Sequence, residues 1–99
     1  LLMIAEDSGQ HINNALWAAD LTQAQPLACG AQVPMSAMTR AMTIPPGGEV
    51  SGLHWFPDLG GFAYLTATVQ KPFSRVEGAT EEERRSRAGY FGPFQPVAP

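Results

Sequence analysis

Ten glycines and nine prolines divide this 99-residue chain into short apolar runs, and their spacing restricts the fold more than any other feature. Both residues are unfavourable inside helices and common in the turns that join strands. The clearest run between them, FAYLTATVQ, is rich in aromatic and β-branched residues, which favour strands. We expect strands at Leu1–Ala5, Ala15–Leu21, Met35–Ile44, Glu49–Phe56 and Phe62–Gln70. The spacing therefore predicts an all-β fold whose consecutive strands form an antiparallel meander.

The C-terminal quarter has a different pattern. Residues 80–87, TEEERRSR, begin with a capping box formed by Thr80 and Glu83 and end with arginines, so they predict a short surface helix. The tail that follows has too many prolines and glycines for a helix, while its aromatic residues are suited to hold it against a neighbouring surface. The sequence thus predicts a partial sheet domain over residues 1–74 and a helix with a tail over residues 75–99.

Charge and composition exclude some classes of partner. The formal net charge of −3 argues against a nucleic-acid partner, which requires a basic surface. No run approaches the roughly 20 apolar residues of a membrane helix, so no membrane span is expected. Cys29 is the only cysteine, which excludes a disulfide within the chain. The acidic excess lies in the first 60 residues, whose carboxylates are Glu6, Asp7, Asp20, Glu49 and Asp58.

Two adjacent carboxylates, Glu6 and Asp7, follow the first expected strand and enter a turn that contains Gly9. Consecutive strand residues point to opposite faces, so both carboxylates reach one ion only where the backbone turns. Carboxylate oxygens with a neighbouring amide oxygen, such as that of Asn13, suit Ca²⁺. The alternative is a turn in which these side chains bind local backbone N–H groups, with His11 as a surface or hydrogen-bonding residue.

A third carboxylate, Glu49, stands at the glycine-rich bend PPGGEVSG, directly before an expected strand. Gly47 and Gly48 allow the chain to bend sharply, and Gly52 allows a ligand or another backbone to approach closely. A carboxylate above an apolar row is costly to bury unless it is paired or binds a metal. Glu49 is therefore a candidate metal ligand, and an exposed position at a strand edge is the alternative.

Arg40 is the candidate for binding an anion. On a regular strand it lies on the same side as Met38 and Met42, which places its guanidinium among apolar neighbours. The fork geometry of arginine matches a phosphate or a carboxylate. Phosphate binding and a structural ion pair with one of the carboxylates are the two interpretations of this residue.

Several stretches together resemble the C-terminal part of the PhoX-type alkaline phosphatase family. They are LLMIAEDSGQHINNALWAADL, TRAMTIPPGGEVSGLHWFPDLGGFAYLTATVQKPF and RRSRAGYFGPF. The most specific elements are the Gly-Glu-Val-Ser-Gly pattern before an aromatic strand with a Pro-Asp turn, and the closing GYFGPF. The resemblance covers most of the chain and is weakest between residues 22 and 37. It implies that the chain is a C-terminal fragment of a longer protein.

The resemblance implies a β-propeller, of which this chain forms about one blade and part of another, packed against the remaining blades. It also implies a periplasmic or secreted bacterial enzyme that releases phosphate from organic phosphate esters at a cluster of calcium and iron ions. In such proteins a carboxylate after the IAED-like strand and the glutamate of the GGEVSG-like turn bind the metals. Asp7, with Glu6 beside it, and Glu49 hold these positions here. The arginine before that turn, Arg40 here, is implied as the catalytic residue that holds the phosphate.

The sequence departs from the family after the aromatic strand, where Val-Gln-His-Pro is frequent and Lys71 here replaces the histidine. The 99 residues lack most ligands of such a cluster, so we expect no appreciable phosphatase activity from them alone. One alternative is a non-catalytic extracytoplasmic β-propeller segment for binding or scaffolding, with structural calcium at most. Another is a different propeller hydrolase, such as a lactonase.

Overall fold

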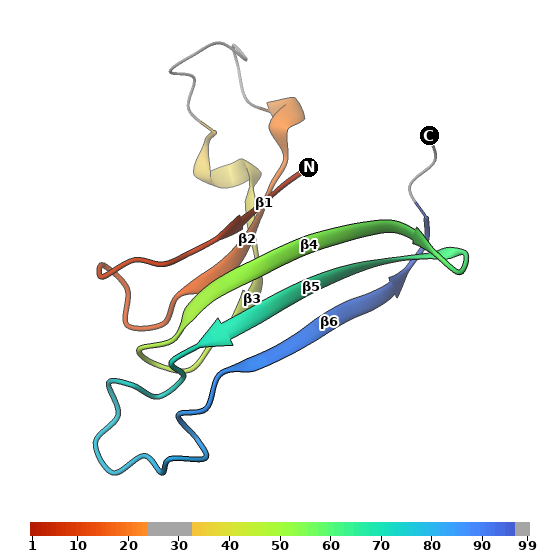
Figure 1. The fold of residues 1–99 in the computed structure, drawn as a ribbon. Helices are drawn as coiled ribbons and strands as arrows, with labels where there is room; N and C mark the ends of the chain where they lie inside the picture. The colour runs from red at the N-terminus through yellow and green to blue at the C-terminus, as the bar shows by residue number, and fades with distance from the viewer. Residues whose placement is uncertain (24–32, 97–99) are drawn as a thin grey trace.

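The computed structural model describes residues 1–23 and 33–96, which form two antiparallel three-stranded sheets (Figure 1). The first sheet has the order β1-β2-β3, with β1 at Leu2–Ala5, β2 at Ala15–Ala19 and β3 at Met38–Thr43. The second has the order β4-β5-β6, with β4 at Glu49–Leu59, β5 at Phe62–Gln70 and β6 at Arg87–Phe94. Single 3-10 turns, η1 at Leu21–Gln23 and η2 at Met35–Ala37, complete the secondary structure of the described residues. Cys29 and the connection around it lie outside them.

A β-bulge in the first sheet decides which way the side chains of β3 point. Leu16 pairs with Met42, but the next residue of β2, Trp17, pairs with Arg40, so the register shifts by one residue between them. Adjacent residues of β2 face opposite sides of the sheet. Met42 therefore lies on the core side with Leu16, while Arg40 lies on the outer side with Trp17. The expectation that Arg40 and Met42 share a face is wrong, because a regular strand was assumed.

The two sheets pack against each other where β1 and β2 meet the beginning of β4. The centre of the core is formed by Leu16, Ile44, Val50 and Leu65, all nearly inaccessible to solvent. Burying a leucine side chain of this kind contributes about 1.5–3 kcal/mol. The core therefore holds together strands that are distant in sequence.

The second sheet continues well past the first as a long β4–β5 hairpin (Figure 1). Gly60 and Gly61, both at positive φ, form its two-residue turn, a conformation that glycine adopts without strain. We refer to residues 54–64 as the hairpin tip. It exposes the apolar side chains of Trp55, Leu59 and Phe62.

The all-β, antiparallel character expected from the sequence is confirmed, and β5 has the predicted bounds. The propeller arrangement stays a prediction. The helix predicted at residues 80–87 is wrong: the segment forms hydrogen-bonded turns, although the capping box of Thr80 and Glu83 is present. A segment this short without an apolar face has no packing to stabilise a helix. The tail after it forms β6, which pairs with β5.

Candidate functional site

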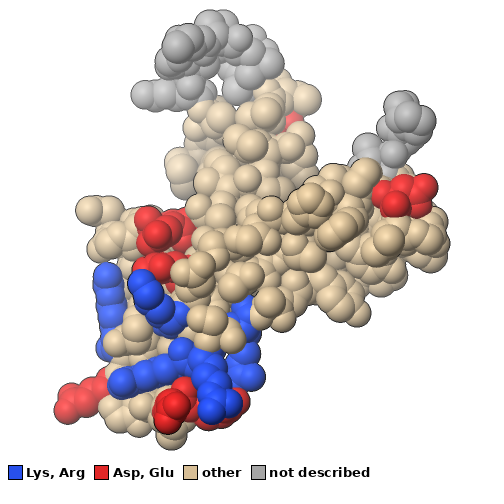
Figure 2. All heavy atoms as spheres, viewed as in Figure 1, with Lys and Arg blue, Asp and Glu red and all other residues tan. Residues whose placement is uncertain are grey.

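Three bends meet at the end of the molecule opposite the hairpin tip: residues 6–14, 45–49 and 71–75. We call them the bend cluster. The Nδ2 group of Asn14, which is buried, donates to the carbonyl oxygen of Gly48 at 2.8 Å. Figure 2 shows that the charged side chains gather toward this end, and five of the six Lys and Arg residues lie between residues 71 and 87.

Gly47 permits a close approach between two bends of the bend cluster. Its N–H donates to the carbonyl oxygen of Ile12 at 3.0 Å, and its carbonyl oxygen accepts a hydrogen bond from Ser74 Oγ at 2.7 Å. Its φ is 77°, and a Cβ atom would lie 2.7 Å from the backbone nitrogen of Arg75. Only glycine adopts this φ without strain and leaves room for the backbone of Arg75. The first glycine of the PPGG sequence therefore allows residues 71–75 to pack against the 45–49 bend.

A polar pocket opens between the three bends. It is lined by Asp7, Ser8, Gly9, His11, Asn14, Gly47, Glu49 and Arg75. Asp7 and Glu49 come from separate bends, and the backbone N–H of Val50 donates to the carbonyl oxygen of Glu6 at 3.2 Å, which ties these bends together. The structure thus brings together the two carboxylates that the sequence analysis connected.

Glu49 is half-buried at the start of β4 and has a cationic neighbour. Its Oε1 atom lies 3.4 Å from Nζ of Lys71, the residue that follows β5. The side chain of Glu49 is 27% exposed and that of Lys71 is 66% exposed, so solvent screens the pair. Lys71 therefore offsets part of the charge of Glu49 and leaves the carboxylate accessible.

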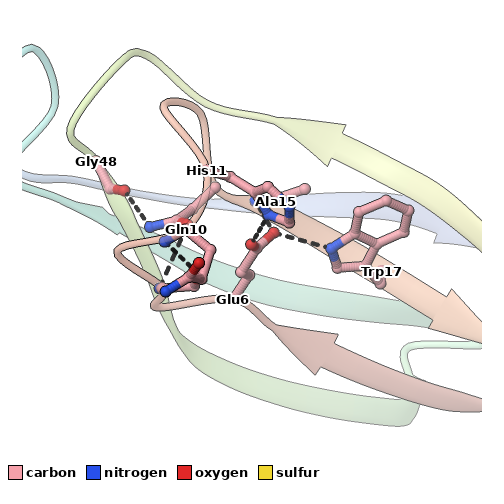
Figure 3. A network of polar contacts seen from close by, with 8 residues as sticks. Glu6, Gln10, His11, Ala15, Trp17 and Gly48 are labelled. Carbon is pink, nitrogen blue, oxygen red and sulfur yellow. Dashed lines mark hydrogen bonds and ion pairs between the residues drawn. The ribbon is translucent and has the colours of Figure 1, made fainter.

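Glu6 belongs to a different network from its neighbour Asp7 (Figure 3). Its Oε2 atom accepts hydrogen bonds from Trp17 Nε1 at 3.0 Å and from the backbone N–H of Ala15 at 3.2 Å, while Oε1 contacts Nδ1 of His11. Burial by itself raises the pKa of Glu6, but the hydrogen bonds from Trp17 and His11, the charge of His11 and the N–H of Ala15 together lower it. Glu6 does not line the pocket and acts as a structural anchor of the first bend.

Arg40 also lies outside the residues that line the pocket. Its guanidinium carbon is 4.9 Å from the centre of the Trp17 ring, a cation–π contact on the outer face of the first sheet. Among residues 1–23 and 33–96 it forms no ion pair with a carboxylate. The ion pair with a carboxylate that the sequence suggested as an alternative for Arg40 is therefore not formed among these residues, and the contact with Trp17 is found instead.

Sequence reasoning missed Arg75 and Asn14 and assigned His11 no role in the pocket. All three line it, because the tertiary structure folds residues 71–75 and 8–14 over the same turn. One signal was present in the sequence: the residues directly after β5 carry cations, whereas the two other bends carry carboxylates. Complementary charge at the ends of consecutive strands is a reason to expect such bends to meet.

The implied metal cluster can be compared with the donors at the pocket. Asp7 and Glu49 supply carboxylate oxygens, which suit hard cations such as calcium. Within the described parts of the chain, no group of three His, Cys, Asp or Glu side chains is placed to hold a metal ion. The donor chemistry fits, and a complete coordination shell requires further ligands.

Comparison with protein-family models, curated proteins and solved structures found no match. In the portions of the chain that the structure describes, no helix has the length and apolarity needed to cross a membrane.

Proposed function

We propose that this chain is part of a metal-dependent phosphomonoesterase of the PhoX type, which releases phosphate from organic phosphate esters. The observation that carries the proposal is the position of Asp7 and Glu49: two carboxylates from separate bends line one polar pocket. The motifs that resemble the PhoX family contain both residues. An extracytoplasmic bacterial location and a β-propeller completed by further blades follow from the same resemblance.

In this proposal the pocket forms one wall of the active site. Asp7 and Glu49 would hold cations of a calcium and iron cluster, which supplies Lewis-acid polarisation of the phosphoryl oxygens when bound. Asn14 fixes the distance between the bends by its hydrogen bond to Gly48, and Glu6 fixes the first bend from behind. The chain itself therefore contributes ligands and their positions, while other ligands come from further blades.

The carboxylates can be tested on the 99-residue chain by titration with terbium, a luminescent substitute for calcium. We expect Asp7→Asn and Glu49→Gln each to weaken terbium binding, because each removes one anionic ligand. Asp58→Asn is the matched control, since Asp58 is an exposed carboxylate at the hairpin tip. Equal effects of all three substitutions would contradict a site at the pocket.

The reaction is tested in the longer protein that the proposal requires. Glu49→Gln should abolish hydrolysis of p-nitrophenyl phosphate, while Asp58→Asn should leave it intact. Metal analysis should find iron together with calcium. The isolated 99 residues should have no appreciable activity, and measurable turnover by them would contradict the division of ligands proposed above.

A non-catalytic β-propeller segment that binds structural calcium at most is the second candidate. It is favoured by the pairing of Glu49 with Lys71 and by the small number of carboxylates at the pocket. Under this alternative the longer protein would contain calcium alone or no metal, and Glu49→Gln would change stability without affecting any phosphatase activity.

A further inference from the structure

The segment after β5 is held in an unusual backbone conformation. Lys71 and Phe73 both have positive φ, at 47° and 58°, although neither is glycine. Two successive turns follow from this, with Ser74 N–H donating to the carbonyl oxygen of Lys71 and Val76 N–H donating to that of Phe73. Such conformations are costly and persist only where surrounding contacts enforce them, often at functional sites.

Contacts with the 45–49 bend provide this enforcement. Pro72 is buried, and Ser74 Oγ donates to the carbonyl oxygen of Gly47 at 2.7 Å. Because Gly47 has no side chain, the backbone and Cγ of Arg75 approach it closely: a Cβ at Gly47 would lie 2.9 Å from that Cγ. The strained segment thus places Arg75 against the wall of the pocket.

The charges at the pocket are not all paired with each other. Glu49 has Lys71 as its neighbour, whereas Asp7 and Arg75 form no side-chain hydrogen bond or ion pair within residues 1–23 and 33–96. The pocket therefore offers an available carboxylate and an available guanidinium. A cation together with an oxyanion satisfies both, and a guanidinium fork fits two oxygens of a phosphoryl group.

We propose that Arg75 is the residue that binds the phosphoryl group of the substrate at the Asp7–Glu49 pocket. This inference rests on the proposed phosphomonoesterase function and adds a specificity-determining residue to it. Arg40, which the sequence resemblance implied for this role, stacks on Trp17 on the outer face of the first sheet and does not line the pocket. Arg75 lines the pocket, and its segment is held there by the buried Pro72 and by the hydrogen bond from Ser74 to Gly47.

The experiment uses the ¹⁵N-labelled 99-residue chain with saturating calcium, titrated with phenyl phosphate and followed by NMR of the arginine Nε–Hε groups and by calorimetry. Phenyl sulfate at the same concentration is the ligand control. We expect Arg75→Met to weaken phenyl phosphate binding by about tenfold to a hundredfold. Arg40→Met removes the same charge and should not change the affinity measurably.

Two further readouts separate a binding role from a structural one. The Nε–Hε signal of Arg75, assigned by its loss in Arg75→Met, should shift on titration, and that of Arg40 should not. Arg75→Lys retains the charge but loses the fork, so it should bind with an affinity between those of the wild type and Arg75→Met. Backbone amide spectra of the unliganded variants should match the wild type outside the bend cluster.

The proposal is overturned if Arg75→Met binds phenyl phosphate as the wild type does, if Arg40→Met shows the larger loss, or if the wild-type chain does not bind it. The terbium titration shows whether the proposed function fails as well. Loss of terbium binding in Asp7→Asn and Glu49→Gln without any phosphate binding would overturn only the role of Arg75. Failure of both measurements would reject the phosphomonoesterase proposal too.

Discussion

The bend cluster and the hairpin tip are the two ends of the same sheet of β4, β5 and β6, and they are built in opposite ways. At the bend cluster three loops meet over a buried core and are joined by side-chain hydrogen bonds to backbone carbonyls. At the hairpin tip one tight turn joins two strands, and apolar side chains remain exposed on both. Side chains from distant parts of the chain are therefore positioned in this molecule by loops that converge, since strand pairing alone fixes only neighbouring residues.

The largest difference in stability between the two ends is expected when a leucine is replaced by alanine at each. Leu16 is 1% exposed beneath the bend cluster, so Leu16→Ala should lower the free energy of unfolding by about 2–5 kcal/mol. Leu59 at the hairpin tip is 59% exposed, and Leu59→Ala should change it by no more than about 0.5 kcal/mol. Urea unfolding followed by tryptophan fluorescence measures both, and similar losses would remove the distinction between the ends.

The turns provide the next comparison. Gly47→Ala should destabilise the fold by at least about 2 kcal/mol, because a left-handed alanine is strained and its Cβ meets the backbone of Arg75. Gly60 also has positive φ, but a Cβ there has no heavy atom within 4 Å, so Gly60→Ala should cost about 1 kcal/mol. Thermal unfolding of the two variants tests this, and a smaller loss for Gly47→Ala would mean that the bends do not meet as described.

Removal of a side-chain hydrogen bond should also destabilise the fold more at the bend cluster than at the hairpin tip. Asn14→Ala leaves the carbonyl oxygen of Gly48, which is buried, without its donor, and should cost about 1–3 kcal/mol. Asp58 accepts from the N–H of Gly61 at the exposed hairpin turn, where water can replace it, so Asp58→Ala should cost about 0.5 kcal/mol. Chemical denaturation at neutral pH compares them directly. An effect of Asp58→Ala as large as that of Asn14→Ala would argue against a special role for burial.

The smallest effect concerns pH. The pKa of Glu6 is lowered from its ordinary value of 4.5, so its ionised form is favoured in the folded state. The resulting stabilisation is complete above pH 4.5 and is lost as the pH falls through the lowered pKa. Glu6→Gln should therefore be less stable than the wild type at neutral pH, by about 1 kcal/mol, and the difference should shrink in acid.

The control for this prediction is Trp17→Phe, which keeps an aromatic ring but removes one hydrogen bond to Glu6. Like Glu6→Gln, it should lower the free energy of unfolding at neutral pH, and the loss should again shrink in acid. The loss should be smaller than that of Glu6→Gln. If the free energy of unfolding depends on acidic pH in both variants as it does in the wild type, the Glu6 network does not contribute to the stability of the first bend.

The sequence predicted those parts of the fold that depend on local pattern. FAYLTATVQ between glycines and a proline defined β5 with its observed bounds, because strand propensity and turn residues act within a few positions. The capping box of Thr80 and Glu83 formed as predicted, but the helix did not. Strand β6 was not predicted, because its aromatic and glycine residues become a strand only through pairing with β5.

The candidate site was also predicted only in part, because local pattern indicates where a side chain stands along the chain and not which distant residues it meets. Bends that contain glycine next to Asp7 and Glu49 indicated two places where carboxylates leave the strands, and both carboxylates line the pocket. The orientation of Glu6 and Arg40 was beyond local pattern. A donor from Trp17 turns Glu6 away from Asp7, and a bulge opposite Trp17 turns Arg40 to the outer face.

The strand-and-turn pattern and the placement of carboxylates at its bends can be predicted from the amino-acid sequence, because backbone preferences and side-chain alternation are local properties. The docking of residues 71–75 on Gly47, which brings Arg75 into the pocket, is visible only in the folded structure. That contact depends on packing between segments distant in the chain, where the burial of Pro72 and the hydrogen bond from Ser74 to Gly47 offset the backbone strain at Lys71 and Phe73.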